Sequence, residues 1–145
     1  MEKEIGSIEK DKFADIIAVS GNPTVDVTEK DFKIEIPSTI PTGNVTFVIH
    51  SDGPTLHEFN VARTDLANLT SLRASDDSLN DAPDTPNPHF IHDPAWEIEG
   101  IDIGMTKRLT VPIDHLDTSK GWHYVFYCNM DGHFMAGMIA QAVAQ

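Results

Sequence analysis

The sequence contains only one cysteine, Cys128, among its 145 residues. An internal disulfide is therefore impossible, and cysteine pairing carries no information about the redox compartment. Long apolar runs are also missing, since no stretch approaches the roughly 18 consecutive apolar residues typical of a membrane-spanning helix. At its start, the printed chain has no basic stretch followed by an apolar run, so we expect no signal peptide within it.

Positive charge is scarce as well. The chain has 10 Lys and Arg against 23 Asp and Glu, which gives a formal net charge of −13. So few and scattered cations cannot neutralise a phosphate backbone, and nucleic acid is therefore excluded as a partner. A basic or neutral protein partner, steered by the negative field, fits this charge better.

Alternating apolar and polar residues predict β-structure over residues 25–61 and 98–145. The period of two is clearest at Phe32–Ile34–Ile36, Val45–Phe47–Ile49, Leu109–Val111–Ile113 and Trp122–Tyr124–Phe126–Cys128. Clusters of Gly, Pro, Asn and Asp separate these segments. Short alternating strands between turns indicate one all-β domain, an antiparallel sandwich or barrel.

Residues 62–97 do not follow this pattern and are interpreted as an insertion. Leucines at 66, 69 and 72 follow Thr64-Asp65, which predicts a short capped helix. From Asp76 to Pro94 the chain has four prolines and many Asp and Asn, so we expect an irregular loop. Such a long loop in a small domain is either functional or mobile.

The segment after residue 127 has the pattern Cys128-x4-His133-x4-Met138, with Gly132 and Gly137 before the His and the Met. Thiolate, imidazole and thioether, together with a second imidazole, are the ligands of a mononuclear copper electron-transfer site. One loop would therefore supply three of four ligands to a copper ion. The two glycines would allow that loop to turn tightly.

The second imidazole is predicted from the parity of the strands. Cys128 shares its face with Tyr124 and Phe126, and His57 shares its face with Phe59, so both side chains should point into the core. Spacing alone leaves this assignment open, because the chain has seven histidines. Any inward-facing histidine on a neighbouring strand would also complete the site.

Two motifs carry a resemblance to the cupredoxins, the plastocyanin-like blue copper proteins. Residues 43–59, with Gly53-Pro54-Thr55-Leu56-His57-Glu58-Phe59, resemble the family's G-P-x-x-H-E-F stretch, and residues 127–138 resemble its Y-C-x-x-x-G-H-x-x-x-G-M loop. The loop spacing is similar to that of rusticyanin and sulfocyanin and longer than that of plastocyanin. The resemblance implies a Greek-key β-sandwich over residues 25–145. It also implies one type 1 copper ion bound by His57, Cys128, His133 and Met138.

The family resemblance further implies an electron carrier rather than an enzyme, working in the periplasm or outside the cell, although a cytoplasmic location stays open. Two alternatives also stay open: a copper enzyme acting on a small molecule such as nitric oxide, and a copper storage or assembly module. Phe134 and Met135, beside His133, are predicted to form an apolar docking surface for a redox protein.

The N-terminal segment and the histidine pair at 89 and 92 carry two further motifs. Residues 5–23 resemble the closing segment of amidohydrolases, which carries no catalytic metal ligand in those enzymes. Residues 1–24 are therefore interpreted as a separate N-terminal extension, and we expect it to form a hairpin. His89-x-x-His92 with Asp93 has the residue types of a second metal site. In a proline-rich loop, however, we favour solvated histidines.

Overall fold

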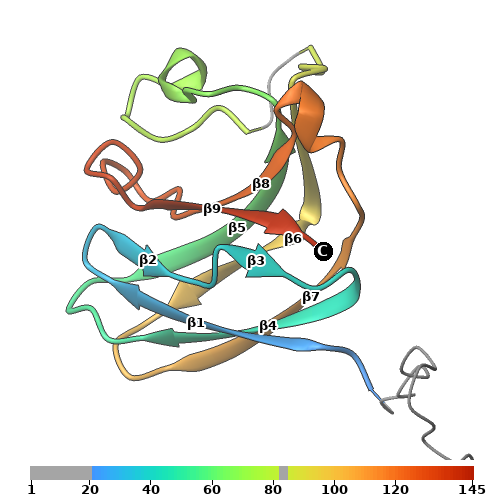
Figure 1. Ribbon diagram of the computed structural model, residues 1–145. Coiled ribbons are helices and arrows are strands. Elements are labelled where there is room, and N and C mark those ends of the chain that lie inside the picture. The colour runs from blue at the N-terminus through green and yellow to red at the C-terminus, as the bar shows by residue number, and fades with distance from the viewer. Residues whose placement is uncertain (1–20, 82–84) are drawn as a thin grey trace, which may run out of the picture.

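Strands form where β-branched and aromatic residues alternate with polar ones. The structure, a computed structural model, describes residues 21–81 and 85–145. Strand β4 (Gly43–Ser51) illustrates the pattern, because Val45, Phe47 and Ile49 are fully buried while their neighbours face outward. Two sheets built in this way pack face to face, as Figure 1 shows. The predicted all-β sandwich is confirmed.

The first sheet has the order β2-β1-β4-β7 and the second has the order β3-β9-β8-β5-β6. The remaining strands are β1 (Thr24–Lys30), β2 (Lys33–Glu35), β3 (Thr39–Ile40), β5 (His57–Thr64), β6 (Phe90–Ile101), β7 (Thr106–Ile113), β8 (His123–Tyr127) and β9 (Ile139–Ala144). Two short 3₁₀ helices, η1 (Thr70–Leu72) and η2 (Thr118–Lys120), complete the described elements. Among these residues no helix is long and apolar enough to cross a membrane.

The expectation of purely antiparallel sheets is wrong. Strand β1 runs parallel to β4, and β3 runs parallel to β9. Apolar alternation shows which side chains face the core but carries no information about strand direction. Each sheet is therefore mixed.

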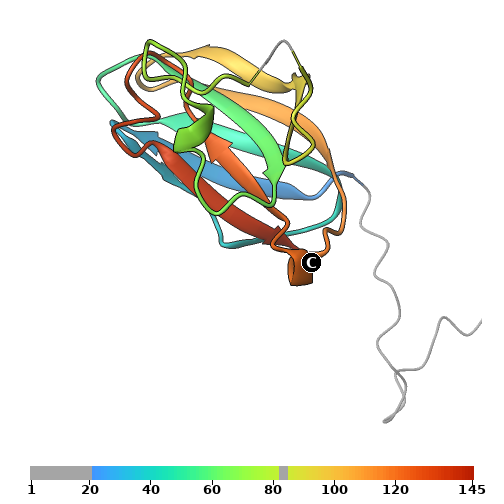
Figure 2. The same ribbon diagram turned by 90° about the horizontal axis from the view of Figure 1, so that it is seen from above.

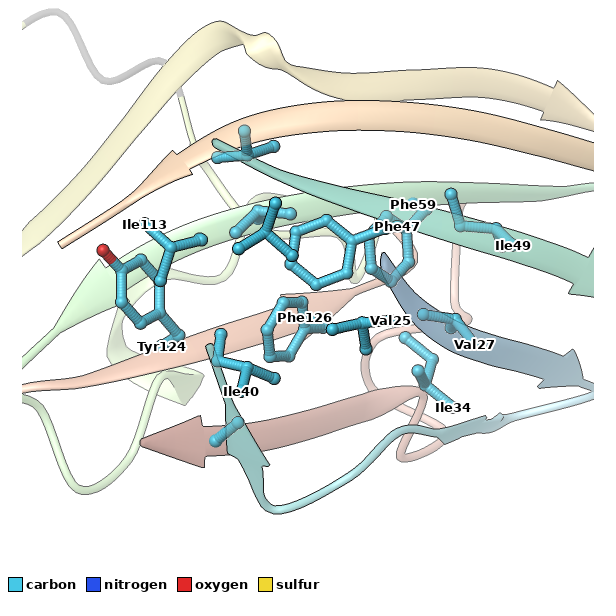
Figure 3. Packing of buried hydrophobic residues seen from close by; sticks show 14 of the residues in the cluster. Val25, Val27, Ile34, Ile40, Phe47, Ile49, Phe59, Ile113, Tyr124 and Phe126 are labelled. Atoms are coloured by element: carbon cyan, nitrogen blue, oxygen red, sulfur yellow. The ribbon is translucent and has the colours of Figure 1, made fainter. Parts of the chain in front are cut away.

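Aromatic side chains from both sheets meet in the centre of the sandwich, as Figure 3 shows. The ring of Phe47 on β4 lies 5.6 Å from that of Phe59 on β5 and 5.4 Å from that of Phe126 on β8. Phe59 and Phe126 are stacked at 5.7 Å. These separations are within the favourable range for aromatic pairs, so the rings fix β5 and β8 against the opposite sheet.

The insertion packs on the outer face of the second sheet. Leu69 and Leu79 form a second apolar cluster with Val125 and Tyr127, whose side chains point away from the sandwich core. Figures 1 and 2 show this segment lying over that sheet. The predicted helix is present only as the single turn η1.

Residues 90–94, expected to be irregular loop, instead begin strand β6. This strand is at the edge of its sheet and pairs with β5 across two irregularities, which is where a strand tolerates a proline such as Pro94. The hairpin predicted for residues 1–24, and most of the amidohydrolase-like stretch 5–23, lie outside the described residues. Strand β1 begins at Thr24.

Glu29 on β1 is a buried carboxyl group that the sequence pattern did not indicate. Neither carboxyl oxygen has a hydrogen-bond partner among the described residues, and the side chain is fully buried. Burial, and secondarily the charge of Glu58, raises the pKa of Glu29 to about 8. The carboxyl group is therefore mostly neutral at pH 7, which lowers the cost of burying it.

This raised pKa predicts a pH dependence of stability. The folded protein holds the proton of Glu29 up to about pH 8, whereas the unfolded chain releases it near pH 4.5. Stability from this group is therefore fully present below pH 4.5 and is lost as the pH rises toward 8, by at most about 1.4 kcal/mol per pH unit. Glu29→Gln should flatten this slope in urea unfolding of the metal-free protein at pH 5, 6, 7 and 8.

Glu35→Gln is the matched control. Glu35 is partly exposed, and hydrogen bonds from Lys33 and Lys30 lower its pKa, so it stays ionised throughout this window. Its substitution should shift stability by a constant amount. If the wild type and Glu29→Gln lose stability equally between pH 5 and 8, Glu29 is not the titrating group.

Candidate metal centre

Three connections meet at one end of the sandwich, on the left in Figure 1. They are the β1–β2 turn at Asp31 and Phe32, the β4–β5 connection at residues 52–56, and the β8–β9 loop at residues 128–138. Phe32 and His133 are in edge-to-face contact, with ring centroids 5.4 Å apart. Segments far apart in the sequence thus enclose a single site.

The thiol of Cys128 is at the centre of this site. Cys128 directly follows β8, is fully buried, and belongs to the core cluster between the sheets, as its parity predicted. Its Sγ lies 3.4 Å from Nδ1 of His133 and 4.0 Å from Nδ1 of His57. The ligand atoms of all three residues are within 4.8 Å of one another. The structure therefore brings together the cysteine and the two histidines that the sequence indicated.

The β8–β9 loop holds its own shape through backbone hydrogen bonds. The Cys128 N–H donates to the Met138 carbonyl at 3.2 Å, and the Met138 N–H donates to the His133 carbonyl at 3.1 Å. Gly132 and Gly137 have φ angles of +79° and +104°, which other residues adopt only with strain. These contacts tie the ends of the loop together, and the Met138 side chain is fully buried in the same core cluster as Cys128.

His57, at the start of β5, has the carboxylate of Asp31 beside its ring. Its Nε2 lies 3.5 Å from Oδ1 of Asp31, close but without hydrogen-bond alignment, and Thr55 Oγ1 donates to the same carboxylate oxygen at 2.7 Å. Nδ1 is thereby the nitrogen that faces Cys128. A carboxylate behind an imidazole is a common device for fixing the ring of a metal ligand. Asp31 was not singled out in the sequence, because its proximity to His57 depends on the parallel pairing of β1 with β4.

Burial affects the proton affinities of these groups in opposite ways. Burial, and next the neighbouring His133, lowers the pKa of His57, which favours the neutral imidazole that a metal ion requires. Burial raises the pKa of the Cys128 thiol to about 11, although backbone N–H groups act against this. One of them is the Glu58 N–H, which donates to Sγ at 3.3 Å. Such a hydrogen bond also stabilises a thiolate once a cation replaces the proton.

The residues fit a trigonal copper site. With bonds of about 2.3 Å to sulfur and about 2.0 Å to nitrogen, a sulfur and a nitrogen 120° apart lie about 3.7 Å from each other. The two sulfur–nitrogen distances, 3.4 and 4.0 Å, bracket this value. A thiolate with two imidazoles and a nearby buried methionine is also the donor set of mononuclear electron-transfer copper.

Of the two predicted docking residues, Phe134 is buried and Met135 is only partly exposed. Phe134 is only 6% exposed, belongs to the apolar cluster under the insertion, and makes an edge contact with Tyr127. Met135 packs against the same cluster. Phe32 and Leu56, which lie beside the site, are exposed apolar side chains at 46% and 41%. Alternation placed Phe32 on a strand, but it lies in the β1–β2 turn with a φ of +61°.

The pair His89 and His92 also differs from expectation. His89 is exposed, and its Nδ1 lies 3.0 Å from a carboxylate oxygen of Asp65. The side chain of His92, by contrast, is 96% buried, since only 4% of it is exposed. The interpretation of both as solvated histidines is therefore wrong for His92.

Comparisons with known proteins give the fold. No protein-family model matches the sequence, and no curated protein matches it. Among solved structures, auracyanin from Roseiflexus castenholzii superposes with a TM-score of 0.55 at 15% identity, over 87% of this chain and 99% of that one. An azurin from Methylomonas sp. strain J gives 0.56 at 16%, over 86% and 99%. Auracyanin A from Chloroflexus aurantiacus, described as a "blue" copper protein, gives 0.54 at 15%, over 86% and 100%. The chain has the cupredoxin fold.

Gly53 allows His57 and Asp31 to approach the β4–β5 connection. A Cβ at this position would lie 2.5 Å from Nε2 of His57 and 2.7 Å from Oδ1 of Asp31. Gly53→Ala should therefore displace the imidazole and lower the free energy of unfolding of the metal-free protein by about 1–3 kcal/mol in urea. Leu56→Ala, at an exposed position in the same connection, should change it by less than about 0.5 kcal/mol. Equal effects of the two substitutions would show that the close approach is not needed.

Proposed function

We propose that this chain is an electron-transfer protein that uses one type 1 copper ion, which His57, Cys128, His133 and Met138 would hold. The observation that carries this proposal is the buried cluster of one thiol and two imidazoles at the end of a cupredoxin sandwich. The description of a structural neighbour as a "blue" copper protein supports it. A bound copper ion would supply a one-electron couple between Cu(I) and Cu(II).

The chain's own residues suit this role because they exclude water and hold the donors in place. His57, Cys128 and Met138 are fully buried, and the core rings of Phe47, Phe59 and Phe126 belong to the same cluster. Donors fixed by packing in this way move little when the charge of a bound metal changes. A small rearrangement means a low barrier to electron transfer.

His133 is the only one of the four proposed ligands that is not fully buried. An electron can therefore leave or enter through its imidazole, whereas surrounding side chains cover the other three donor residues. This supports electron transfer over the alternative of an enzyme acting on nitric oxide at this centre.

The surface around His133 gives a candidate docking site. Phe32, in edge contact with His133, and Leu56, next to His57, are both exposed and apolar. We expect a basic or neutral redox protein to dock here, because the chain carries a net charge of −13. A location in the periplasm or outside the cell, as the family resemblance implies, is part of this proposal.

The role of Cys128 is tested by Cys128→Ser. Copper bound through a thiolate absorbs visible light intensely, so the copper-loaded wild type should be strongly coloured and the variant should lose this band. Visible absorption and EPR spectra after loading with one equivalent of Cu²⁺ measure the effect. A band that survives in Cys128→Ser would refute the proposed ligand set.

The role of Met138 is tested by Met138→Leu. Leucine fills a similar volume but provides no thioether, so the visible band should persist while the reduction potential rises, because Cu(II) loses a donor. Cyclic voltammetry of the copper-loaded proteins measures this. Met105→Leu, at a methionine that is 46% exposed, should leave the potential unchanged. A potential that is equally unchanged in Met138→Leu would remove Met138 from the proposed ligand set.

A further inference from the structure

A second cluster of metal-binding side chains lies on the outer face of the second sheet. A cavity of about 750 Å³ opens there beside β5, β6 and the insertion. Its lining includes six acidic residues: Glu58, Asp76, Asp81, Glu97, Glu99 and Asp131. No lysine or arginine is among the described residues that line it. Negative charge concentrated in this way favours a bound cation.

One imidazole that lines this cavity has a ring nitrogen with no hydrogen-bond partner among the described residues. His92 lines the cavity, and 4% of its side chain is exposed. Its Nε2 is buried and makes no hydrogen bond to any described residue, and the nearest carboxylate oxygen, Oε2 of Glu97, is 3.8 Å away. A buried polar atom that makes no hydrogen bond is costly, so an imidazole held in this position indicates a missing partner.

An irregularity in β6 places His92 beside Glu97. Ala62 pairs with His92, and Asn60 pairs with Glu97. A step of two residues along β5 therefore corresponds to a step of five residues along β6. Residues 93–96 are accommodated in the bulge between them. His92 and Glu97 therefore occupy neighbouring outward positions on the sheet, although five residues separate them in the sequence.

Asp81, from the insertion, completes the cluster. The ligand atoms of Asp81, His92 and Glu97 all lie within 4.8 Å of one another. The Asn129 amide donates to Oδ2 of Asp81 at 3.2 Å, and the Tyr127 hydroxyl donates to it at 3.3 Å. Two donors on one carboxylate oxygen orient Asp81 and leave its other oxygen for a cation, which is the usual support of a metal ligand.

We propose that Asp81, His92 and Glu97 bind one divalent transition-metal ion of the Zn²⁺ type. One imidazole and two carboxylates form a mixed nitrogen and oxygen donor set that suits such ions, and the two carboxylates balance the charge. Tetrahedral ligand atoms with bonds of about 2.0 Å lie about 3.3 Å apart, so the 3.8 Å between His92 and Glu97 needs only a small closure. A water molecule or a substrate atom would take the fourth position.

This site is separate from the copper centre. Cys128 faces the core between the sheets, whereas Tyr127, the residue before it, faces the outer cluster and reaches Asp81. The test therefore uses full-length Cys128→Ser, which lacks the thiolate of the first centre. Its result does not depend on whether the first centre binds copper.

Isothermal titration of Cys128→Ser with Zn²⁺ at 150 mM NaCl should show one bound ion. Adding His92→Gln or Asp81→Asn to this background should weaken binding at least tenfold, because each removes a ligand. Adding His89→Gln, at an exposed histidine of the same segment, should change affinity by less than twofold. Thermal unfolding should rank the variants in the same way, because Zn²⁺ should raise the Tm only where the three ligands are intact.

Glu97→Gln is a ligand variant that should fold normally, because a third of the Glu97 side chain is exposed and the loss of its charge should not disrupt the fold. It should likewise weaken binding at least tenfold. Equal Zn²⁺ binding by Cys128→Ser and all three added ligand variants would overturn the proposal, since the ion would then bind elsewhere on the acidic surface. Failure of Cys128→Ser itself to bind Zn²⁺ would overturn it as well.

Discussion

The candidate metal centre depends on the antiparallel pairing of β5 with β8 and on the packing of this pair against the opposite sheet. His57 begins β5 and Cys128 follows β8, so the pairing of the two strands sets their separation, and the stacked rings of Phe59 and Phe126 hold the inner face of the pair against the opposite sheet. The sulfur and the two imidazole nitrogens are gathered within 4.8 Å in the protein itself. Packing of the core therefore holds the buried donors of His57 and Cys128 close together. The β8–β9 loop then adds His133 and Met138 to them.

Side chains at the end of β8 face the core and the outer face of the sheet in turn. Successive side chains of a strand point to opposite faces, so Cys128 and Tyr127 face different environments although they are adjacent in the chain. The insertion covers the outer face, buries Phe134 together with Tyr127, and brings Asp81 to the hydroxyl of that tyrosine. The position of the insertion therefore explains both why Phe134, beside His133, is not exposed and why the acidic cavity forms.

Much of the fold and of the first centre could be predicted from the sequence, because period-two alternation and the Cys128-x4-His133-x4-Met138 spacing are local properties. Parity placed His57 on an inward face, and the structure places it there. Strand direction, the burial of Phe134 and the approach of Asp31 could not be predicted in this way, since each depends on pairing between distant segments. His92 was misjudged because a proline-rich composition hid an edge strand, and only the register of β6 brings this histidine to Glu97.

The bulge in β6 has a further consequence for the solubility of the chain. Strand β6 is the last of its sheet, and an edge strand with a regular row of free N–H and C=O groups is a template for pairing with another molecule. Here the row is interrupted at residues 93–96, one of which is Pro94 and lacks an N–H, and the neighbouring acidic side chains repel a second copy. The irregularity that assembles His92 and Glu97 therefore also protects an otherwise open sheet edge against aggregation.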